Sequence, residues 1–160
     1  KEGNIDAILP RSNVLIRPAV ANVDQALVVF AITHPEPNLN LLDRFLVMMG
    51  IQGVPVTICF NKVDLGEAGL VDKYRAIYER AGYEVHFVST YQDTGLEEMR
   101  KFLGGKTSVL AGPSGVGKSS LTNCIQPQAA METGDISRKI ERGRHTTAIL
   151  NCFMWKRIPT

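Results

Sequence analysis

The stretch from Gly112 to Ser119 constrains the fold of this chain more than any other part of its sequence. It reads Gly-Pro-Ser-Gly-Val-Gly-Lys-Ser, which fits the phosphate-binding pattern G-x-x-x-x-G-K-[ST]. The apolar run Thr107–Ala111 precedes it and a helical pattern starting at Lys118 follows it, which is the context that the pattern requires. A glycine-rich turn without a ligand is the alternative, but fewer than about one chain in a hundred of this length carries the full pattern by chance. The sequence therefore predicts a strand, a phosphate loop and a helix in succession.

The chemistry of this loop assigns a role to most of its residues. Glycines let the backbone wrap the phosphates, so that its N–H groups and the N-terminus of the following helix face the anion. Lys118 supplies a mobile positive charge, and the hydroxyl of Ser119 is placed to ligate Mg²⁺. The residues expected to contact the nucleotide here are Ser114, Gly115, Val116, Gly117, Lys118, Ser119 and Ser120.

Apolar runs rich in β-branched residues alternate with amphipathic segments from Ala26 onward. Such alternation is typical of β-α-β units and of a mainly parallel sheet with helices on both faces. The sequence therefore predicts the α/β class. The expected strands are Ala26–Ile32, Val54–Phe60, Glu84–Val88, Thr107–Ala111 and Ala148–Trp155.

Helical spacing of apolar residues predicts a surface helix after each of the first three strands. Gly50, Gly82 and Gly104 are expected to end these helices. Thr94 and Glu97 have the spacing of a capping box, which would start the third helix with a side-chain hydrogen bond. The apolar positions are Leu39, Leu42, Phe45, Leu46 and Met49 in the first helix, Leu70, Tyr74, Ile77 and Tyr78 in the second, and Leu96, Met99, Phe102 and Leu103 in the third.

A second candidate binding motif, Asn61-Lys62-Val63-Asp64, follows the strand Val54–Phe60 directly and resembles the N-K-x-D motif of GTPases. Ligands bind outside the carboxyl ends of the strands in open α/β sheets, so a base is expected here. Guanine carries two adjacent donors, N1–H and the exocyclic amine, which match the two oxygens of Asp64. Asn61 would approach the O6/N7 edge or brace the phosphate loop, and the stem of Lys62 would lie against the ring. An ordinary solvated loop is the alternative for this motif taken alone.

The end of the next strand, Val88-Ser89-Thr90, resembles the S-A-x loop of GTPases, with Thr90 in place of alanine. That position contacts the base oxygen by its backbone N–H, so the replacement is tolerated if the threonine side chain points away. Both base-contacting segments precede the phosphate loop, whereas in ordinary GTPases the phosphate loop comes first. A circular permutation explains the order, because sheet geometry can keep the strand ends together.

With this order, the chain resembles the bacterial circularly permuted, ribosome-small-subunit-dependent GTPases. The segments 134–140 and 143–147, which follow the phosphate-loop helix, lie where GTPases place switch I. Further agreement lies in the segments 13–18, 21–25 and 43–46, so the resemblance covers almost the whole chain. It implies a Ras-like P-loop NTPase fold in permuted order, with GTP and GDP as ligands and Mg²⁺ as cofactor. It also implies hydrolysis of GTP stimulated by the small ribosomal subunit, and a role in late maturation of that subunit.

The resemblance implies catalytic roles for Lys118, His145 and Thr147. Thr146 or Thr147 would join Ser119 at Mg²⁺ in the triphosphate state, and spacing does not decide which. A solvated loop histidine is the alternative for His145. The D-x-x-G segment that positions the γ-phosphate is expected after the strand 148–155, but the sequence ends at Thr160. We therefore expect this chain to bind GDP and to hydrolyse GTP weakly.

The resemblance also implies a division into domains and a set of partners. Residues 1–22 are expected to be the tail and linker of an N-terminal OB-fold, and residues 23–160 the circularly permuted GTPase domain, truncated before D-x-x-G. A zinc-binding domain is implied beyond residue 160. The implied partners are the small ribosomal subunit and its rRNA, and we expect a monomer without membrane association.

Composition limits the remaining functions. The formal net charge of +2 is too small to attract nucleic acid by field alone, so RNA contact requires a local patch. A basic stretch at residues 138–145 offers one, and a solvated face is its alternative. Three cysteines without paired spacing argue against a disulfide framework or a zinc site within the chain. The most apolar run, Ala26–Ile32, is too short to span a bilayer, so we expect a cytoplasmic protein.

Two other functions remain open. One is a nucleotide-gated rRNA-binding module, in which bound nucleotide orders the switch and hydrolysis only resets it. The other is an ATP-using P-loop enzyme, which Asp64 disfavours because adenine lacks the matching pair of donors.

Overall fold

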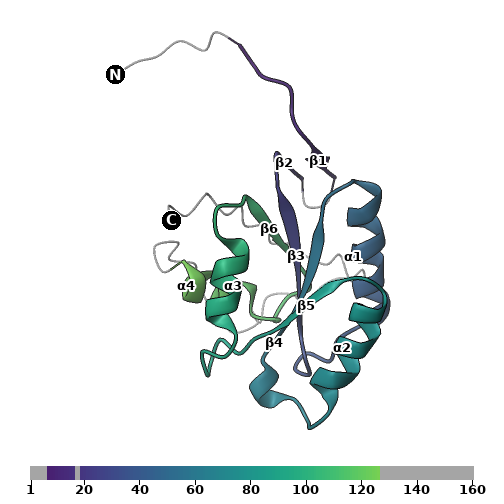
Figure 1. Ribbon diagram of the computed structural model, residues 1–160, viewed down its shortest axis with the longest axis vertical. Coiled ribbons are helices and arrows are strands. Elements are labelled where there is room, and N and C mark those ends of the chain that lie inside the picture. The colour runs from purple at the N-terminus through teal and green to yellow at the C-terminus, as the bar shows by residue number, and fades with distance from the viewer. Residues whose placement is uncertain (1–6, 17–18, 127–160) are drawn as a thin grey trace, which may run out of the picture.

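The computed structural model describes residues 7–16 and 19–126, and a parallel β-sheet lies at its centre (Figure 1). The four strands of this sheet stand in the order β5-β4-β3-β6, and each neighbouring pair is parallel. The strands are β3 (Gln25–Ala31), β4 (Val56–Asn61), β5 (Glu84–Phe87) and β6 (Ser108–Ala111). The four strands expected in this part of the chain are therefore confirmed, with ends that differ by one or two residues.

Helices cover both faces of the sheet, which confirms the predicted α/β class (Figure 1). On one face lie α1 (Leu39–Ile51) and α2 (Leu70–Arg80). On the other face lie α3 (Leu96–Leu103) and α4 (Lys118–Ile125). A short 3-10 helix, η1 (Val63–Leu65), connects β4 towards α2.

Strand β3 shows why a core forms on each face. All seven of its residues are buried, because β3 lies between β4 and β6 and beneath helices on both sides. Side chains alternate along a strand. Val28 and Phe30 join the core beneath α1 and α2, whereas Leu27 and Val29 join the core beneath α3 and α4. A continuous apolar run is thus what a central parallel strand requires.

Helix α1 continues past Gly50 and ends at Ile51. The left-handed residue after the helix is Gly53, at φ 67. The N–H of Val54 donates to the carbonyl of Met49 at 3.2 Å, and the N–H of Gly53 donates to that of Gly50 at 3.1 Å. These two bonds form a Schellman motif. The expectation that Gly50 ends α1 is therefore wrong, whereas Gly82, at φ 87, follows α2 as expected.

The start of α3 also differs from the expectation of a capping box. Its N-cap is Gly95, in left-handed backbone at φ 70, and no side-chain hydrogen bond caps the helix. Thr94 instead pairs with Ser89 through two backbone hydrogen bonds of 3.0 and 3.2 Å. A Cβ at position 95 would overlap the carbonyl oxygen of Phe87, so glycine is required there. The capping box of Thr94 and Glu97 is therefore wrong, because Thr94 belongs to the preceding turn.

Residues 13–16 and 19–23 lie next to the sheet, with Leu15 and Val23 buried in the core beneath α1. The strands β1 (Val14–Leu15) and β2 (Val20–Ala21) form an antiparallel pair. The side chain of Asn13 donates to the carbonyl of Val23 at 2.6 Å and accepts from its N–H at 3.0 Å. The assignment of residues 1–22 to a preceding OB-fold stays a prediction.

Several expectations fall outside the described residues. They are the switch-like segments with His145, Thr146 and Thr147, the basic stretch at 138–145, and the strand 148–155. Within residues 7–16 and 19–126, no helix combines the length and apolar character that crossing a membrane requires.

Candidate nucleotide-binding site

The expected phosphate and base motifs meet at the carboxyl end of the sheet. Strand β6 leads into the phosphate loop (residues 112–117), β4 leads into the base motif (residues 61–64), and β5 leads into the second base loop (residues 88–90). Because β6 and β4 both pair with β3, their ends lie on either side of one strand. Segments that are far apart in the sequence are thus brought to one edge of the sheet.

Two glycines of the phosphate loop permit close contacts that any side chain would prevent. Gly112 has φ +146, and a Cβ there would overlap the carbonyl oxygen of Val29 in β3. Gly117 has φ +92, and a Cβ there would overlap Nδ2 of Asn61. The phosphate loop therefore packs against β3 at its start and against the base motif at its end.

Lys118 begins α4, and its side chain folds back into the phosphate loop. Nζ donates to the carbonyl oxygens of Gly112 at 3.0 Å and Pro113 at 2.5 Å. The residue is only 5% exposed, and this burial lowers the pKa of its ammonium to about 8. Within the described part of the chain, no carboxylate forms an ion pair with it. A bound phosphate would supply the missing opposite charge.

The amino end of α4 is open to an anion. Gly117 is the N-cap, and no side-chain hydrogen bond caps this end of the helix. The first N–H groups of a helix lack intrahelical partners and carry a partial positive charge, which favours a phosphate. The other expected contacts lie around the same helix end: Ser114 is exposed, Gly115, Ser119 and Ser120 are half-buried, and Val116 is buried.

Asn61 connects the base motif with the phosphate loop. Its fully buried side chain donates from Nδ2 to the carbonyl of Val116 at 3.0 Å. Oδ1 of Asn61 accepts from the N–H of Thr90, in the second base loop, at 3.4 Å. Of the two roles considered from the sequence, the contact with Val116 corresponds to bracing the phosphate loop. The N–H of Thr90, expected at the base oxygen, is directed to Asn61 in this structure.

Lys62 joins the base motif to two further segments. Its backbone is left-handed at φ 62, and Nζ donates to the carbonyls of Gly115 at 2.8 Å and His34 at 2.6 Å. His34 lies in the connection between β3 and α1. Nothing in the sequence indicates this contact, because the backbone carbonyl of any residue can accept such a hydrogen bond. The stem of Lys62 is thereby stretched from the base motif towards the phosphate loop.

Asp64 is oriented by a side chain from the neighbouring strand end. Ser89 donates from Oγ to Oδ1 of Asp64 at 2.5 Å and accepts the N–H of Gln92 at 3.0 Å. Ser89 is fully buried, so its hydroxyl holds the carboxylate in one orientation. The sequence predicts Ser89 in the second base loop, but nothing in it indicates the contact with Asp64. The bonds made by Asn61 and Lys62 hold the base motif beside the phosphate loop. Asp64 in the base motif and Lys118 at the end of the loop therefore belong to one candidate site.

Ser119 is the described residue that would ligate Mg²⁺. Among the described residues, no group of three or more His, Cys, Asp or Glu side chains could hold a metal ion. One hydroxyl beside a phosphate loop fits Mg²⁺, since this ion keeps waters and takes few protein ligands beside substrate phosphates. Thr146 and Thr147, the other expected ligands, lie outside the described residues.

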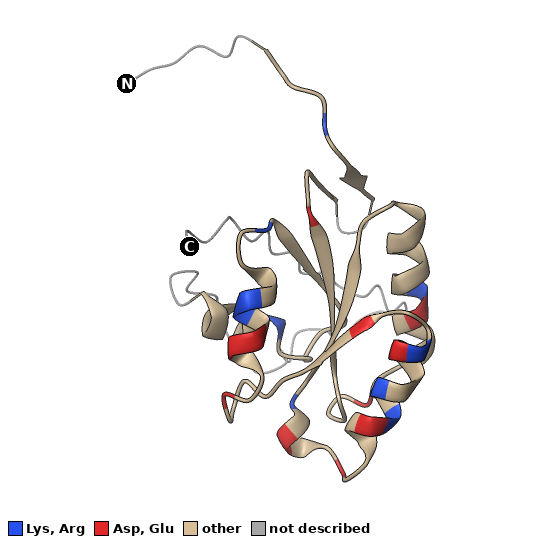
Figure 2. Ribbon diagram, viewed as in Figure 1, with Lys and Arg blue, Asp and Glu red and all other residues tan. Residues whose placement is uncertain are grey.

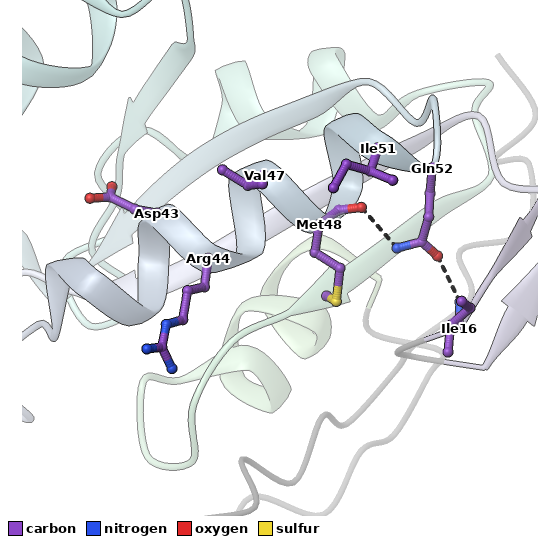
Figure 3. Close-up of a pocket in the computed structure, with 7 residues that line it drawn as sticks. All are labelled: Ile16, Asp43, Arg44, Val47, Met48, Ile51 and Gln52. Carbon is purple, nitrogen blue, oxygen red and sulfur yellow. Dashed lines mark hydrogen bonds between the residues drawn. The ribbon is translucent and has the colours of Figure 1, made fainter.

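A pocket of about 500 Å³ lies beside α1, away from these motifs (Figure 3). The side chain of Gln52 connects two of its walls, donating to the carbonyl of Met48 at 2.9 Å and accepting the N–H of Ile16 at 2.7 Å. None of the nucleotide motifs contributes to it, so it is not the candidate site. Its lining residues are Ile16, Asp43, Arg44, Val47, Met48, Ile51 and Gln52.

The fold and the site together define a class of protein. A parallel sheet in which an N-K-x-D motif precedes, and is bonded to, the phosphate loop is that of a circularly permuted GTPase. The chain belongs to the RsgA GTPase family, whose family model matches residues 8–157.

Curated relatives agree with this membership. The protein named small ribosomal subunit biogenesis GTPase RsgA from Agathobacter rectalis is 59% identical over 145 residues, which are 91% of this chain and 48% of that protein. Its namesake from Alkaliphilus metalliredigens is 52% identical over 147 residues, 92% of this chain and 50% of that protein. The chain thus spans about half the length of the curated relatives it matches.

Solved structures agree as well. The crystal structure of YjeQ from Thermotoga maritima superposes with a TM-score of 0.69 at 39% identity, covering 76% of this chain and 45% of that one. The structure of YloQ, described as a circularly permuted GTPase, gives a TM-score of 0.65 at 41% identity, covering 76% of this chain and 44% of that one. The predicted permuted fold is therefore confirmed.

Proposed function

We propose that this chain is the guanine-nucleotide-binding and GTP-hydrolysing domain of a protein that acts in late maturation of the small ribosomal subunit. The observation that carries the proposal is the pair of hydrogen bonds from Asn61 and Lys62 to the carbonyls of Val116 and Gly115. These bonds hold the base motif against the phosphate loop, which supports the proposal that one nucleotide contacts both. The printed names of the relatives supply the ribosomal role.

The proposed chemistry is transfer of the γ-phosphoryl group of GTP to water, which releases GDP and phosphate. Such transfer depends on positioning and on stabilising negative charge. Lys118 and the amino end of α4 would stabilise the phosphates, and Asp64 would hold the base. Mg²⁺, bound through Ser119 and through Thr146 or Thr147, would neutralise charge on the phosphates. Thr147 and His145 are proposed to act at the γ-phosphate and its attacking water.

The proposed partner is the small ribosomal subunit, contacted through its rRNA. Figure 2 shows acidic and basic residues interspersed along α2 and α3, while α1 carries one adjacent acidic and basic residue, so these helices do not form a continuous basic surface. The basic stretch at 138–145 is the better candidate for rRNA phosphates. Residues 23–160 are proposed as the GTPase domain and residues 1–22 as the tail of an OB-fold, in a cytoplasmic monomer.

Turnover of GTP tests the proposal directly. We expect slow release of phosphate by the chain alone and at least about tenfold faster release with purified small subunits, because activators supplied in trans stabilise the transition state. Phosphate release is measured with wild type and with Lys118→Ala as the inactive control. Subunit binding that depends on GTP without faster turnover would instead favour the nucleotide-gated rRNA-binding module.

Base selectivity is tested without the ribosome. We expect GDP at saturation to raise the melting temperature by about 5 °C or more, since a ligand at a hundred times its Kd adds about 2.7 kcal/mol. ADP at the same concentration should give a much smaller shift, because adenine offers Asp64 no matching pair of donors. Equal shifts with both nucleotides would remove the base-reading assignment.

A further inference from the structure

Helix α1 carries an apolar patch on its outward side. Val47 is 60% exposed, Ile51 is 82% exposed, and Ile16, which directly follows β1, is 74% exposed. All three line the pocket beside α1 (Figure 3). Exposed apolar side chains that gather in one patch with a polar rim mark a site of interaction. The pocket is therefore a candidate docking surface, separate from the nucleotide motifs.

The patch has the form that packs against a second helix. Residues four apart on an α-helix lie one above the other, so two neighbouring rows of side chains run along α1 at the pocket (Figure 3). Each row covers about 12 Å of the helix axis. The groove between two such rows is where a row of side chains from another helix fits. The rows are Asp43, Val47 and Ile51, and Arg44, Met48 and Gln52.

The groove is formed before any partner binds. The side chain of Gln52 donates to the carbonyl of Met48 at 2.9 Å and accepts the N–H of Ile16 at 2.7 Å, which fixes the wall across from α1. A preformed wall lowers the entropic cost of binding. The half-buried thioether of Met48 between these walls can adjust to apolar side chains of different shapes.

The charges at the other end of the groove indicate the chemistry of the partner. Asp43 already accepts a hydrogen bond from the hydroxyl of Tyr78 in α2 at 3.2 Å. Arg44 is exposed and has no ion pair or hydrogen bond with any residue that the structure describes. A guanidinium without a partner favours a carboxylate, which it binds through two parallel hydrogen bonds. RNA is a poorer match, because its affinity depends on several cations and not on an apolar surface.

We propose that the groove along α1 binds an amphipathic helix of a partner protein. Apolar side chains of that helix contact Val47, Met48 and Ile51, and one of its carboxylates pairs with Arg44. Such a helix presents its apolar side chains at spacings of three and four residues. The inference goes beyond the proposed function, since none of the nucleotide motifs lines the groove.

A synthetic peptide labelled with fluorescein tests the apolar part of the groove. The peptide is an alanine-rich helix of about 16 residues, with three leucines spaced three or four apart and one glutamate a turn beyond them. We expect fluorescence anisotropy to give a Kd of about 100 μM or tighter with the wild-type chain. Ile51→Glu should weaken binding about tenfold or more, because it places a charge against leucine. Ile77→Glu, which changes an exposed isoleucine on α2, is the matched control and should bind like wild type.

An exchange of charges tests the role of Arg44 and separates docking from unspecific apolar contact. Arg44→Glu should weaken the glutamate peptide about tenfold and should prefer a second peptide in which lysine replaces the glutamate. The melting temperature of each variant, measured without nucleotide, shows that it is folded.

Four results would overturn the inference. They are no binding of the glutamate peptide to wild type up to about 1 mM, undiminished binding to Ile51→Glu, no reversal of peptide preference in Arg44→Glu, and tighter binding of single-stranded RNA than of peptide at this surface. A dimer of the chain that Ile51→Glu converts to a monomer would also overturn it, because a second copy would then occupy the groove.

Discussion

Replacing Lys118 by alanine will abolish tight nucleotide binding while the domain stays folded. Among the described residues, the buried ammonium bonds only to the carbonyls of Gly112 and Pro113 and has no carboxylate partner, so a phosphate is the expected counter-ion. Removing one member of a buried charge pair costs about 2–5 kcal/mol, which corresponds to a loss of GDP affinity of about thirtyfold to several thousandfold. Calorimetric titration of GDP measures the loss. Lys101→Ala, which removes an exposed lysine on α3, is the control.

The burial of Lys118 also predicts how the stability of the unliganded protein depends on pH. Burial lowers the pKa of Lys118 to about 8, below the ordinary lysine value of about 10.4. Between these two values the unfolded chain binds more protons than the folded one, so the contribution of Lys118 makes stability rise with pH. Below about pH 8 Lys118 is charged in both the folded and the unfolded chain, so the folded state carries the full free-energy cost of burying that charge. This contribution should be missing from Lys118→Met, which keeps the apolar stem.

A Lys118→Ala variant that bound GDP like wild type would contradict the binding prediction, because it would mean that the loop holds another ligand.

Replacing Asp64 by asparagine should move the base preference from guanine towards xanthine. Ser89 donates to Oδ1 of Asp64, and the amide oxygen of asparagine can accept that same bond. The amide nitrogen is then left to face the 2-position of the purine, where it donates to the oxygen of xanthine and clashes with the amine of guanine. We expect GDP to bind about a hundredfold more weakly, because the site then leaves polar groups unpaired.

Competition between GDP and XDP measures this exchange of preference. Asp72→Asn, which removes a carboxylate from the first turn of α2, is the matched control and should keep the wild-type preference. Unchanged selectivity for guanine in Asp64→Asn would show that another group reads the amino edge of the base. In that case the bond from Ser89 would be structural and not a means of orienting a base-binding carboxylate.

The elements of this fold could be predicted closely, because their signals are local. The apolar runs gave the four described strands, and the glycine pattern placed the start of α4 at Lys118. Errors arose where tertiary contacts decide the local backbone. Gly50 continues α1 because the left-handed position falls on Gly53, and Thr94 does not cap α3 because its backbone is paired with Ser89.

The site could be predicted in its residues but not in its bonds. Asn61, Lys62 and Asp64 follow from a motif, whereas their partners are carbonyls or a hydroxyl fixed by the sheet order. The hydrogen bond from Lys62 Nζ to the backbone carbonyl of His34 depends only on where the backbone lies. The residue type at position 34 therefore does not predict it.

The sheet order also determines when the candidate nucleotide-binding site can form during synthesis of the chain. Strand β6 is the last of the described strands to join the sheet, where it pairs with β3, and the bond between Gln25 and Ser108 joins residues 83 positions apart. Closing so long a stretch of chain is slow compared with the formation of the β3, β4 and β5 segments, whose connections are shorter. Because residues 61–64 precede residues 112–117 in the sequence, the proposed base motif emerges from the ribosome before the phosphate loop. GDP binding by a growing chain would accordingly mark the moment at which the last described strand and helix have joined the fold.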